Sequence, residues 1–162
     1  MIFYLKRTCL TRVQIEYVDA ILASADDLLK LANSIVKKPK VLLVEDNPII
    51  QRVHQYMLSD LGCETEIAKD GAEALVLGRH DYDLIFLDIG LPDLNGIEVA
   101  KKLRRYPNHI HTPILALTAH VDAVTKKNCL EAGVVRVLHK PVEFNTLAEM
   151  LRDYNLISEE SQ

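Results

Sequence analysis

The sequence predicts an α/β fold: a long N-terminal helix followed by a flavodoxin-like, five-stranded parallel sheet in the order 2-1-3-4-5. After residue 39, short apolar runs alternate five times with helical patterns, which is typical of a doubly wound sheet. Three of the runs, at residues 41–44, 84–87 and 114–117, are continuously apolar. Such runs are expected where helices cover both faces of a strand.

The first segment, residues 1–38, is predicted to hold one amphipathic helix at about residues 11–36, with Thr11 as N-cap and Pro39 ending it. Its apolar side chains recur at spacings of 3 and 4 residues, as in paired helices. These positions are Val18, Ile21, Ala25, Leu28, Ala32 and Ile35, with Leu22, Leu29 and Val36 beside them. Exposing so wide a stripe is costly, so we expect it to pack, either on its own domain or on a second copy of the helix.

The second segment, residues 39–155, holds the sheet, and a polar tail of residues 156–162 follows it. The predicted strands are residues 41–44, 65–68, 84–87, 114–117 and 134–138. The predicted helices are residues 47–61, 71–79, 96–105, 123–132 and 144–154.

The composition excludes several classes of protein. A net charge of −4 over 162 residues gives no reason to expect nucleic acid or an anionic membrane as a partner. No apolar run approaches the ~20 residues that span a bilayer. Three cysteines, far apart in the sequence, disfavour a disulfide framework and fit a cytoplasmic location, with Cys63 and Cys129 interpreted as buried small side chains. A basic run is interpreted as a solvated helix face: Lys101, Lys102, Arg104 and Arg105.

The chemistry-bearing residues stand where the predicted strands end. Glu45 and Asp46 follow the first strand, Asp88 the third, Thr118 the fourth and Lys140 the fifth. Ligands of open α/β sheets bind outside these carboxyl ends. Oxygen ligands suit Mg²⁺, and a carboxylate beside it can attack phosphorus to form an aspartyl-phosphate. An ammonium and a hydroxyl group can stabilise the phosphoryl oxygens.

Four stretches, residues 43–47, 86–96, 116–119 and 139–141, resemble in order the motifs of the receiver domains of two-component response regulators. The resemblance covers about residues 40–153. It implies the flavodoxin-like fold, acceptance of a phosphoryl group from a histidine kinase or a phosphotransfer domain, and Mg²⁺ as cofactor.

The resemblance also implies a role for each side chain. Asp88 is then the phosphoacceptor, and Thr118 and Lys140 contact the phosphoryl group. The implied Mg²⁺ ligands are Glu45, Asp46, Asp88 and the backbone carbonyl of Gly90. The peptide bond between Lys140 and Pro141 is expected to be cis. At Val137, three residues before the lysine, receivers commonly carry Tyr or Phe, so the aromatic half of their switch is in question here.

The N-terminal helix is similar to the second helix of the dimerisation and phosphotransfer domain of histidine kinases. This likeness implies a remnant of a hybrid sensor kinase that forms a homodimer through residues 11–36. The first helix of such domains, with its phosphorylatable histidine, and the ATP-binding motifs do not occur in the sequence. We therefore expect no ATP-dependent kinase activity from these residues.

The sequence leaves three alternatives to a phosphoryl-accepting receiver open. One is a phosphatase of the haloacid dehalogenase type, which needs a second acid two residues after the nucleophile, where this chain has Gly90. A second is a non-signalling interaction module that pairs through its first helix. In the third, the acidic, hydroxyl and ammonium groups are merely solvated residues at the starts of loops.

Overall fold

The computed structural model describes residues 12–35 and 37–158. The chain divides into two compact units, with the boundary in the sequence between Lys37 and Lys38. The described part of the first unit is one helix of 24 residues, α1 (Arg12–Ile35), as predicted. Thr11 and Val36, the expected ends of this helix, lie outside the described residues. Among the helices that the structure describes, none combines the length and hydropathy needed to cross a membrane.

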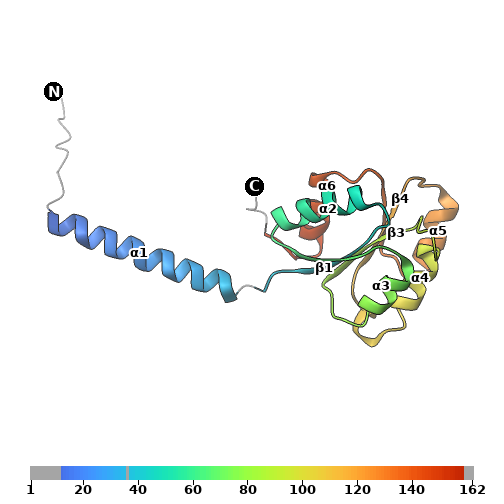
Figure 1. Ribbon diagram of the computed structural model, residues 1–162, viewed down its shortest axis with the longest axis horizontal. Coiled ribbons are helices and arrows are strands. Elements are labelled where there is room, and N and C mark those ends of the chain that lie inside the picture. Colours follow the sequence, from blue (N-terminus) through green and yellow to red (C-terminus); the bar gives the residue numbers. More distant parts are fainter. Residues whose placement is uncertain (1–11, 36, 159–162) are drawn as a thin grey trace, which may run out of the picture. The chain divides into compact units, whose positions relative to one another are not determined.

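The second unit is built on a parallel sheet of five strands in the order β2-β1-β3-β4-β5 (Figure 1), which confirms the predicted fold class and order. The strands are β1 (Lys40–Val44), β2 (Glu64–Ala68), β3 (Leu84–Asp88), β4 (Ile114–Thr118) and β5 (Arg136–His139). This order places β1, β3 and β4 inside the sheet, and their residues are almost all fully buried.

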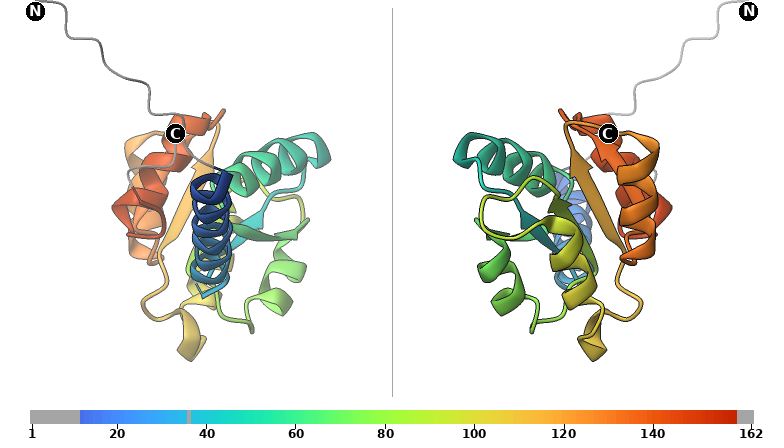
Figure 2. Two further views of the ribbon diagram at one scale, coloured as in Figure 1. Left: turned by 90° about the vertical axis from the view of Figure 1, so that its left-hand side faces the viewer. Right: turned by 90° about the vertical axis from the view of Figure 1, so that its right-hand side faces the viewer.

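Helices cover both faces of the sheet (Figures 1 and 2). One face carries α2 (Pro48–Asp60) and α6 (Phe144–Asp153). The other face carries α3 (Gly71–Leu77), α4 (Gly96–Leu103) and α5 (Ala123–Glu131), and a 3₁₀ turn, η1 (Pro107–His109), leads into β4. Because side chains alternate along a strand, Leu42 and Ile85 pack under the second group of helices, while Leu43 and Phe86 pack under the first.

An Asn or Asp N-cap ends each of the first four strand-to-helix loops. Asn47, Asp70, Asn95 and Asp122 accept hydrogen bonds from backbone N–H groups in the first turns of α2, α3, α4 and α5, respectively. A cap fixes where a helix begins because it satisfies amides that have no partner inside the helix. The loops at the carboxyl edge of the sheet are therefore short and well defined.

The last strand begins two residues later than expected, at Arg136 rather than residue 134. Gly133 adopts a left-handed conformation, with φ of +89°, directly after α5. The N–H group of Val134 then donates to the carbonyl of Cys129 (3.0 Å) and closes the helix end. Val134 therefore belongs to the turn and not to the strand.

The basic run on α4 is only partly a solvated face. Its other members are exposed, but Arg104, the C-cap of α4, is half-buried, and its guanidinium group donates to three backbone carbonyls. The acceptors are His109 (2.5 Å), Thr112 (2.6 Å) and Gly133 (2.6 Å from Nη2 and 3.0 Å from Nε). The interpretation as a solvated side chain is therefore wrong for Arg104: turns of two separate loops leave carbonyls unpaired beside it, and the planar guanidinium group satisfies them.

The two cysteines in the described part of the chain are buried free thiols, as interpreted from the sequence. Burial, with a smaller contribution from the charge of Asp83, raises the pKa of Cys63 to about 11. Burial also raises the pKa of Cys129.

Candidate functional site

The ammonium group of Lys140 joins the ends of three strands. Lys140 follows β5, and its Nζ lies 2.6 Å from Oε2 of Glu45, which follows β1. The same Nζ lies 2.7 Å from Oδ2 of Asp88, the last residue of β3. Glu45 is only 1% exposed and Asp88 only 6% exposed, so these are charge-assisted contacts in a largely desolvated place.

Backbone contacts fix the position of Glu45. Its N–H group donates to the carbonyl of Ala68 at the end of β2 (3.0 Å), which extends the sheet pairing by one residue. Its carbonyl accepts from the side-chain amide of Gln51 on α2 (2.6 Å). The N–H group of Asn47 reaches the second carboxylate oxygen of Glu45 (3.3 Å). Contacts from β2 and from the start of α2 therefore fix the backbone of Glu45, and the amide of Asn47 also binds its carboxylate.

Both carboxylate oxygens of Asp88 are engaged. Oδ2 accepts from Lys140, and Oδ1 accepts from the backbone N–H group of Gly90 (2.8 Å). The loop after β3 turns back on itself here, because Gly96 packs directly against the backbone of Asp88 and Ile89. A side chain at Gly96 would collide with the carbonyl oxygen of Asp88, so only glycine allows this turn.

Thr118 lies at the end of β4 and is 8% exposed, but its hydroxyl group faces its own loop. Oγ1 donates to the carbonyl of His120 (3.1 Å) and accepts from its N–H group (3.2 Å). The backbone of Thr118 accepts from the N–H group of Lys140 (2.8 Å), so the two residues are neighbours across the sheet. The Lys140–Pro141 peptide bond is cis, as expected.

Charge and burial oppose each other at this site. Burial raises the pKa of Glu45, and the hydrogen bond and positive charge of Lys140 counteract only part of that effect. Burial also disfavours the charged form of Lys140, but its hydrogen bonds to Asp88 and Glu45 outweigh this and raise the pKa of the ammonium group. Lys140 therefore remains a cation at neutral pH, bound between two carboxylates.

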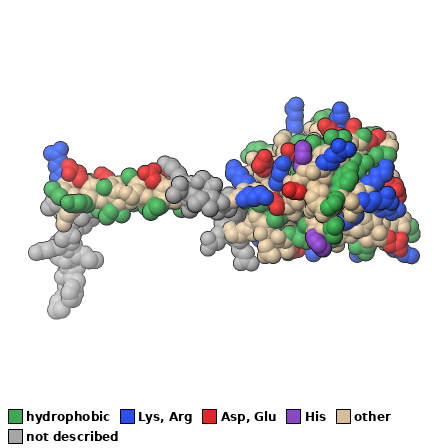
Figure 3. All heavy atoms as spheres, turned by 90° about the horizontal axis from the view of Figure 1, so that it is seen from below, with side chains coloured by type: hydrophobic (Ala, Val, Ile, Leu, Met, Phe, Trp, Pro, Cys, Tyr) green, Lys and Arg blue, Asp and Glu red, His purple; other side chains and the backbone are tan. Residues whose placement is uncertain are grey.

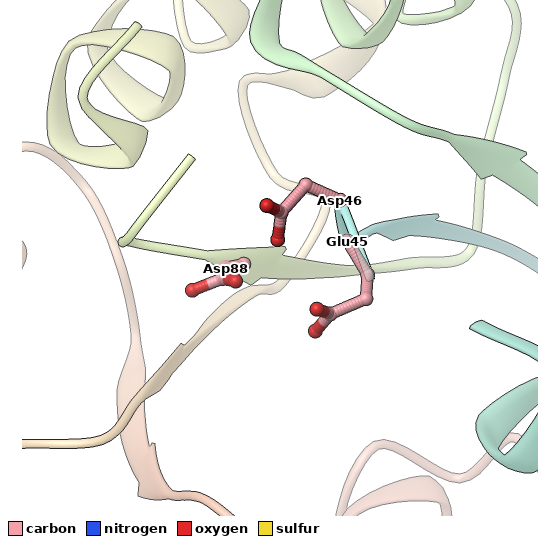
Figure 4. A group of neighbouring side chains, drawn as sticks. All are labelled: Glu45, Asp46 and Asp88. Atoms are coloured by element: carbon pink, nitrogen blue, oxygen red, sulfur yellow. The ribbon is translucent and has the colours of Figure 1, made fainter. Parts of the chain in front are cut away.

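Three carboxylates meet at this edge of the sheet (Figure 4). One ligand oxygen each from Glu45, Asp46 and Asp88 lies within 4.8 Å of the others, and Asp46 is exposed to solvent. Three carboxylates and one ammonium group carry a net charge of about −2, which a divalent cation would balance. An all-oxygen set that is open to water on one side fits a hard cation such as Mg²⁺.

The structure thus brings Glu45, Asp46, Asp88 and Lys140 together. Thr118 is the neighbour of Lys140 across the sheet, and its hydroxyl group is bound to the backbone of His120. Gly90 contacts Asp88 through its N–H group. Gln51, which supports Glu45 from the next helix, could not be found from the sequence pattern, because only the packing of α2 brings the two residues together.

Comparisons with known proteins agree with this geometry. Residues 41–152 match the family of response regulator receiver domains. The chain is 38% identical over 116 residues to the aerobic respiration control sensor protein ArcB of Escherichia coli. It is 34% identical over 122 residues to the hybrid signal transduction histidine kinase L of Dictyostelium discoideum. These alignments cover 70% and 71% of the chain but only 15% and 7% of the relatives, so the chain spans a small part of these longer proteins.

Solved structures of similar size resemble the second unit. One is the receiver domain of a sensor histidine kinase from Pseudomonas aeruginosa PAO1, with 35% identity and a TM-score of 0.68 over 73% of this chain and 98% of that one. That structure has a magnesium ion coordinated in its active site cleft. Another is the chemotaxis protein CheY4 of Vibrio cholerae, with 33% identity and a TM-score of 0.70 over 73% of this chain and 99% of that one.

The bridge predicts a large stability loss when the ammonium group is removed. Lys140→Met leaves the carboxylates of Glu45 and Asp88 buried without a cation, and we expect the free energy of unfolding to fall by about 3 kcal/mol. Urea denaturation in EDTA measures this loss. Lys127→Met is the control, because Lys127 is 75% exposed and lies 3.9 Å from Glu131. Equal losses in the two variants would contradict the assignment of the bridge.

Proposed function

The chain belongs to the response regulator receiver family of two-component signalling, and we propose that within it Asp88 accepts a phosphoryl group from a phosphohistidine. The observation that carries this proposal is the contact of Lys140 with both Asp88 and Glu45 at the edge where the family motifs converge. The proposed Mg²⁺ ligands are Glu45, Asp46, Asp88 and the carbonyl of Gly90. Bound Mg²⁺ would neutralise charge that develops on the phosphoryl oxygens.

In the proposed step, a carboxylate oxygen of Asp88 attacks the phosphorus atom of the phosphohistidine. A P–O bond to Asp88 forms as the P–N bond breaks, and the imidazole nitrogen leaves with the electron pair and takes up a proton. Lys140 is already within hydrogen-bond distance of Asp88 and can follow the charge onto the phosphoryl oxygens. The hydroxyl group of Thr118 then exchanges His120 for a phosphoryl oxygen, which moves the loop after β4.

The position usually held by an aromatic residue is filled by Val137, which is half-buried and packs against the core under α3, α4 and α5. A valine at this place has no ring that can turn between an inner and an outer position. We therefore propose that the signal leaves the site through Thr118 and the following loop. A phosphatase of the haloacid dehalogenase type is not favoured, because Gly90 supplies no second acid.

The phosphoryl donor needs a surface beside Asp88, and an apolar groove of about 370 Å³ adjoins the site. Lys140 lines this groove as well as contacting Asp88, so the groove and the acidic site share a wall. The other walls are Ile49, Ile50, Val53, His54 and Met57 of α2 and residues 141–144. Ile49 is 72% exposed and Val53 45% exposed, which leaves apolar surface open to a partner. We propose that an apolar helix face of the donor protein docks here.

The N-terminal helix is proposed to be a kinase dimerisation helix that pairs with α1 of a second copy. Along α1 the large apolar side chains are between 41% and 68% exposed. They are Val13, Ile15, Tyr17, Val18, Ile21, Leu22, Leu28 and Leu29. Figure 3 shows hydrophobic side chains gathered along one side of this helix and acidic side chains along the other. A second copy would cover this stripe. We further propose a cytoplasmic location, which suits the buried free thiols.

The first experiment tests the phosphoacceptor. With Mg²⁺, beryllofluoride should bind and acetyl phosphate should label the wild-type chain, and Asp88→Asn should give neither result, because the amide cannot act as the nucleophile. Mass spectrometry and fluorine NMR measure the two outcomes. Glu98→Gln on α4, whose carboxylate is 55% exposed and pairs with Lys101 away from the site, serves as the control for loss of a carboxylate, and it should still be labelled. Equal labelling of the wild type and Asp88→Asn would rule out Asp88.

A second experiment separates the groove from the chemistry. Val53→Glu places a charge in the groove, and we expect transfer from phosphorylated kinase dimerisation domains to slow on the order of tenfold. Labelling by acetyl phosphate should stay within about twofold of wild type, because a small donor does not use the groove. The control is Val76→Glu on α3, whose valine is 62% exposed outside the groove. Equal slowing by both variants would contradict the docking site.

A third experiment tests pairing through α1. Light scattering should give the molar mass of a dimer for the whole chain and of a monomer for a variant that begins at Lys38, since residues 38–162 form a compact unit by themselves. In the whole chain, Ile21→Glu together with Leu28→Glu should give a monomer, because both charges would fall in the apolar stripe. A whole chain that is monomeric would refute pairing through α1.

A further inference from the structure

The loop that follows the proposed phosphoacceptor, residues 89–95, is attached to β3 at both of its ends. Near its start, the N–H group of Gly90 donates to Oδ1 of Asp88 (2.8 Å). Just past its end, the N–H group of Gly96 donates to the carbonyl of Ile89 (3.2 Å) and the glycine packs on the strand backbone. These contacts fix the two ends but leave the middle of the loop to be held by something else.

The side chain of Asp93 holds the middle of the loop. Its Oδ1 accepts from the N–H group of Gly71 (2.8 Å), and its Oδ2 accepts from the N–H group of Ala72 (2.9 Å). These are the first two residues of α3, so both carboxylate oxygens are bound by one helix end. The two bonds, that of Gly71 first, hold the pKa of Asp93 below its usual value, so the group is ionised at neutral pH. Leu94 also packs directly against Gly71.

The cap of α3 leaves these two N–H groups available. Asp70 accepts from the N–H group of Glu73 (2.7 Å), and the carboxylate of Glu73 accepts from the N–H group of Lys69 (2.9 Å). These two bonds differ from a capping box, because Glu73 binds the amide of the residue before the N-cap, and they satisfy the amides of Glu73 and Lys69 only. The amides of Gly71 and Ala72 are therefore free to bind a carboxylate that lies 21 or 22 residues later in the chain.

The segment bound by Asp93 leads to the other side of the acidic site. Ala68, the last residue of β2, stands three residues before Gly71, and its carbonyl accepts from the N–H group of Glu45 (3.0 Å). Asp93 thus connects the loop that carries Gly90 with the strand end that positions Glu45. A shift of the loop away from α3 would change the spacing between two of the proposed Mg²⁺ ligands.

We propose that Asp93 is a positioning residue for the acidic site, which sets the place of Gly90 by binding the first two amides of α3. This inference rests on the proposed function, because it concerns the same Mg²⁺ and phosphoryl site. Among the hydrogen bonds and ion pairs of the described residues, none joins Asp93 to Asp88 or Lys140. Outer partners of metal ligands typically change metal affinity by 10- to 100-fold when they are removed.

The test compares Asp93→Ala, Asp93→Asn and Asp70→Ala in the full chain. We expect Asp93→Ala to raise the Mg²⁺ concentration at half-saturation about tenfold, as measured by the amide NMR signals of Gly90 and Glu45. Asp93→Asn should lie between this value and that of the wild type, because one acceptor oxygen remains. Asp70→Ala removes a cap from the same helix without touching the loop, so it should lower stability to urea and leave the Mg²⁺ midpoint unchanged.

Two outcomes overturn the inference. One is an Asp93→Ala midpoint within about twofold of the wild type, and the other is an equal rise in Asp70→Ala, which would show that helix stability alone matters. Failure of the proposed function has a different signature, since the wild-type chain itself would then show no Mg²⁺-dependent change at Gly90 and Glu45 and no labelling of Asp88.

Discussion

The ion bridge from Lys140 to Glu45 and Asp88 is the interaction on which the carboxyl edge of the sheet depends. Burial has removed most of the hydration of these two carboxylates, and without a cation between them they would also repel each other. The ammonium group compensates both and joins β1, β3 and β5 through side chains, in addition to the backbone pairing.

Much of the fold was predictable from local patterns. The interior strands are continuous apolar runs because both of their faces are covered, and the capping residues mark where the loops end and the helices begin. The parallel arrangement then requires that residues at strand ends, such as Glu45 and Asp88, meet at one edge. The resemblance to receiver motifs implied the same residues, and the structure brings Glu45, Asp88 and Lys140 together at that edge.

The sequence could not reveal contacts between residues that are distant along the chain and follow no period. Nothing in the local sequence pattern marks Asp93 as a partner of α3, because the amides that it binds lie 21 and 22 residues earlier in the chain. Arg104 reads as part of a basic helix face until the turns at His109 and Gly133 close around it. The start of β5 was misplaced for a related reason, since the turn at Gly133 uses the N–H group of Val134.

The contacts of Arg104 hold together the end of the sheet that lies opposite the acidic site. Its guanidinium group binds the turns that lead into β4 and β5, at the amino ends of these strands, whereas Asp88 lies at the carboxyl end of β3. Among the described residues Arg104 forms none of the ion pairs, so its four hydrogen bonds to backbone carbonyls do not depend on a titrating acid. The ends of β4 and β5 that lie farthest from the site are thus joined by one side chain, so a change of charge at Asp88 does not alter the bonds that hold them.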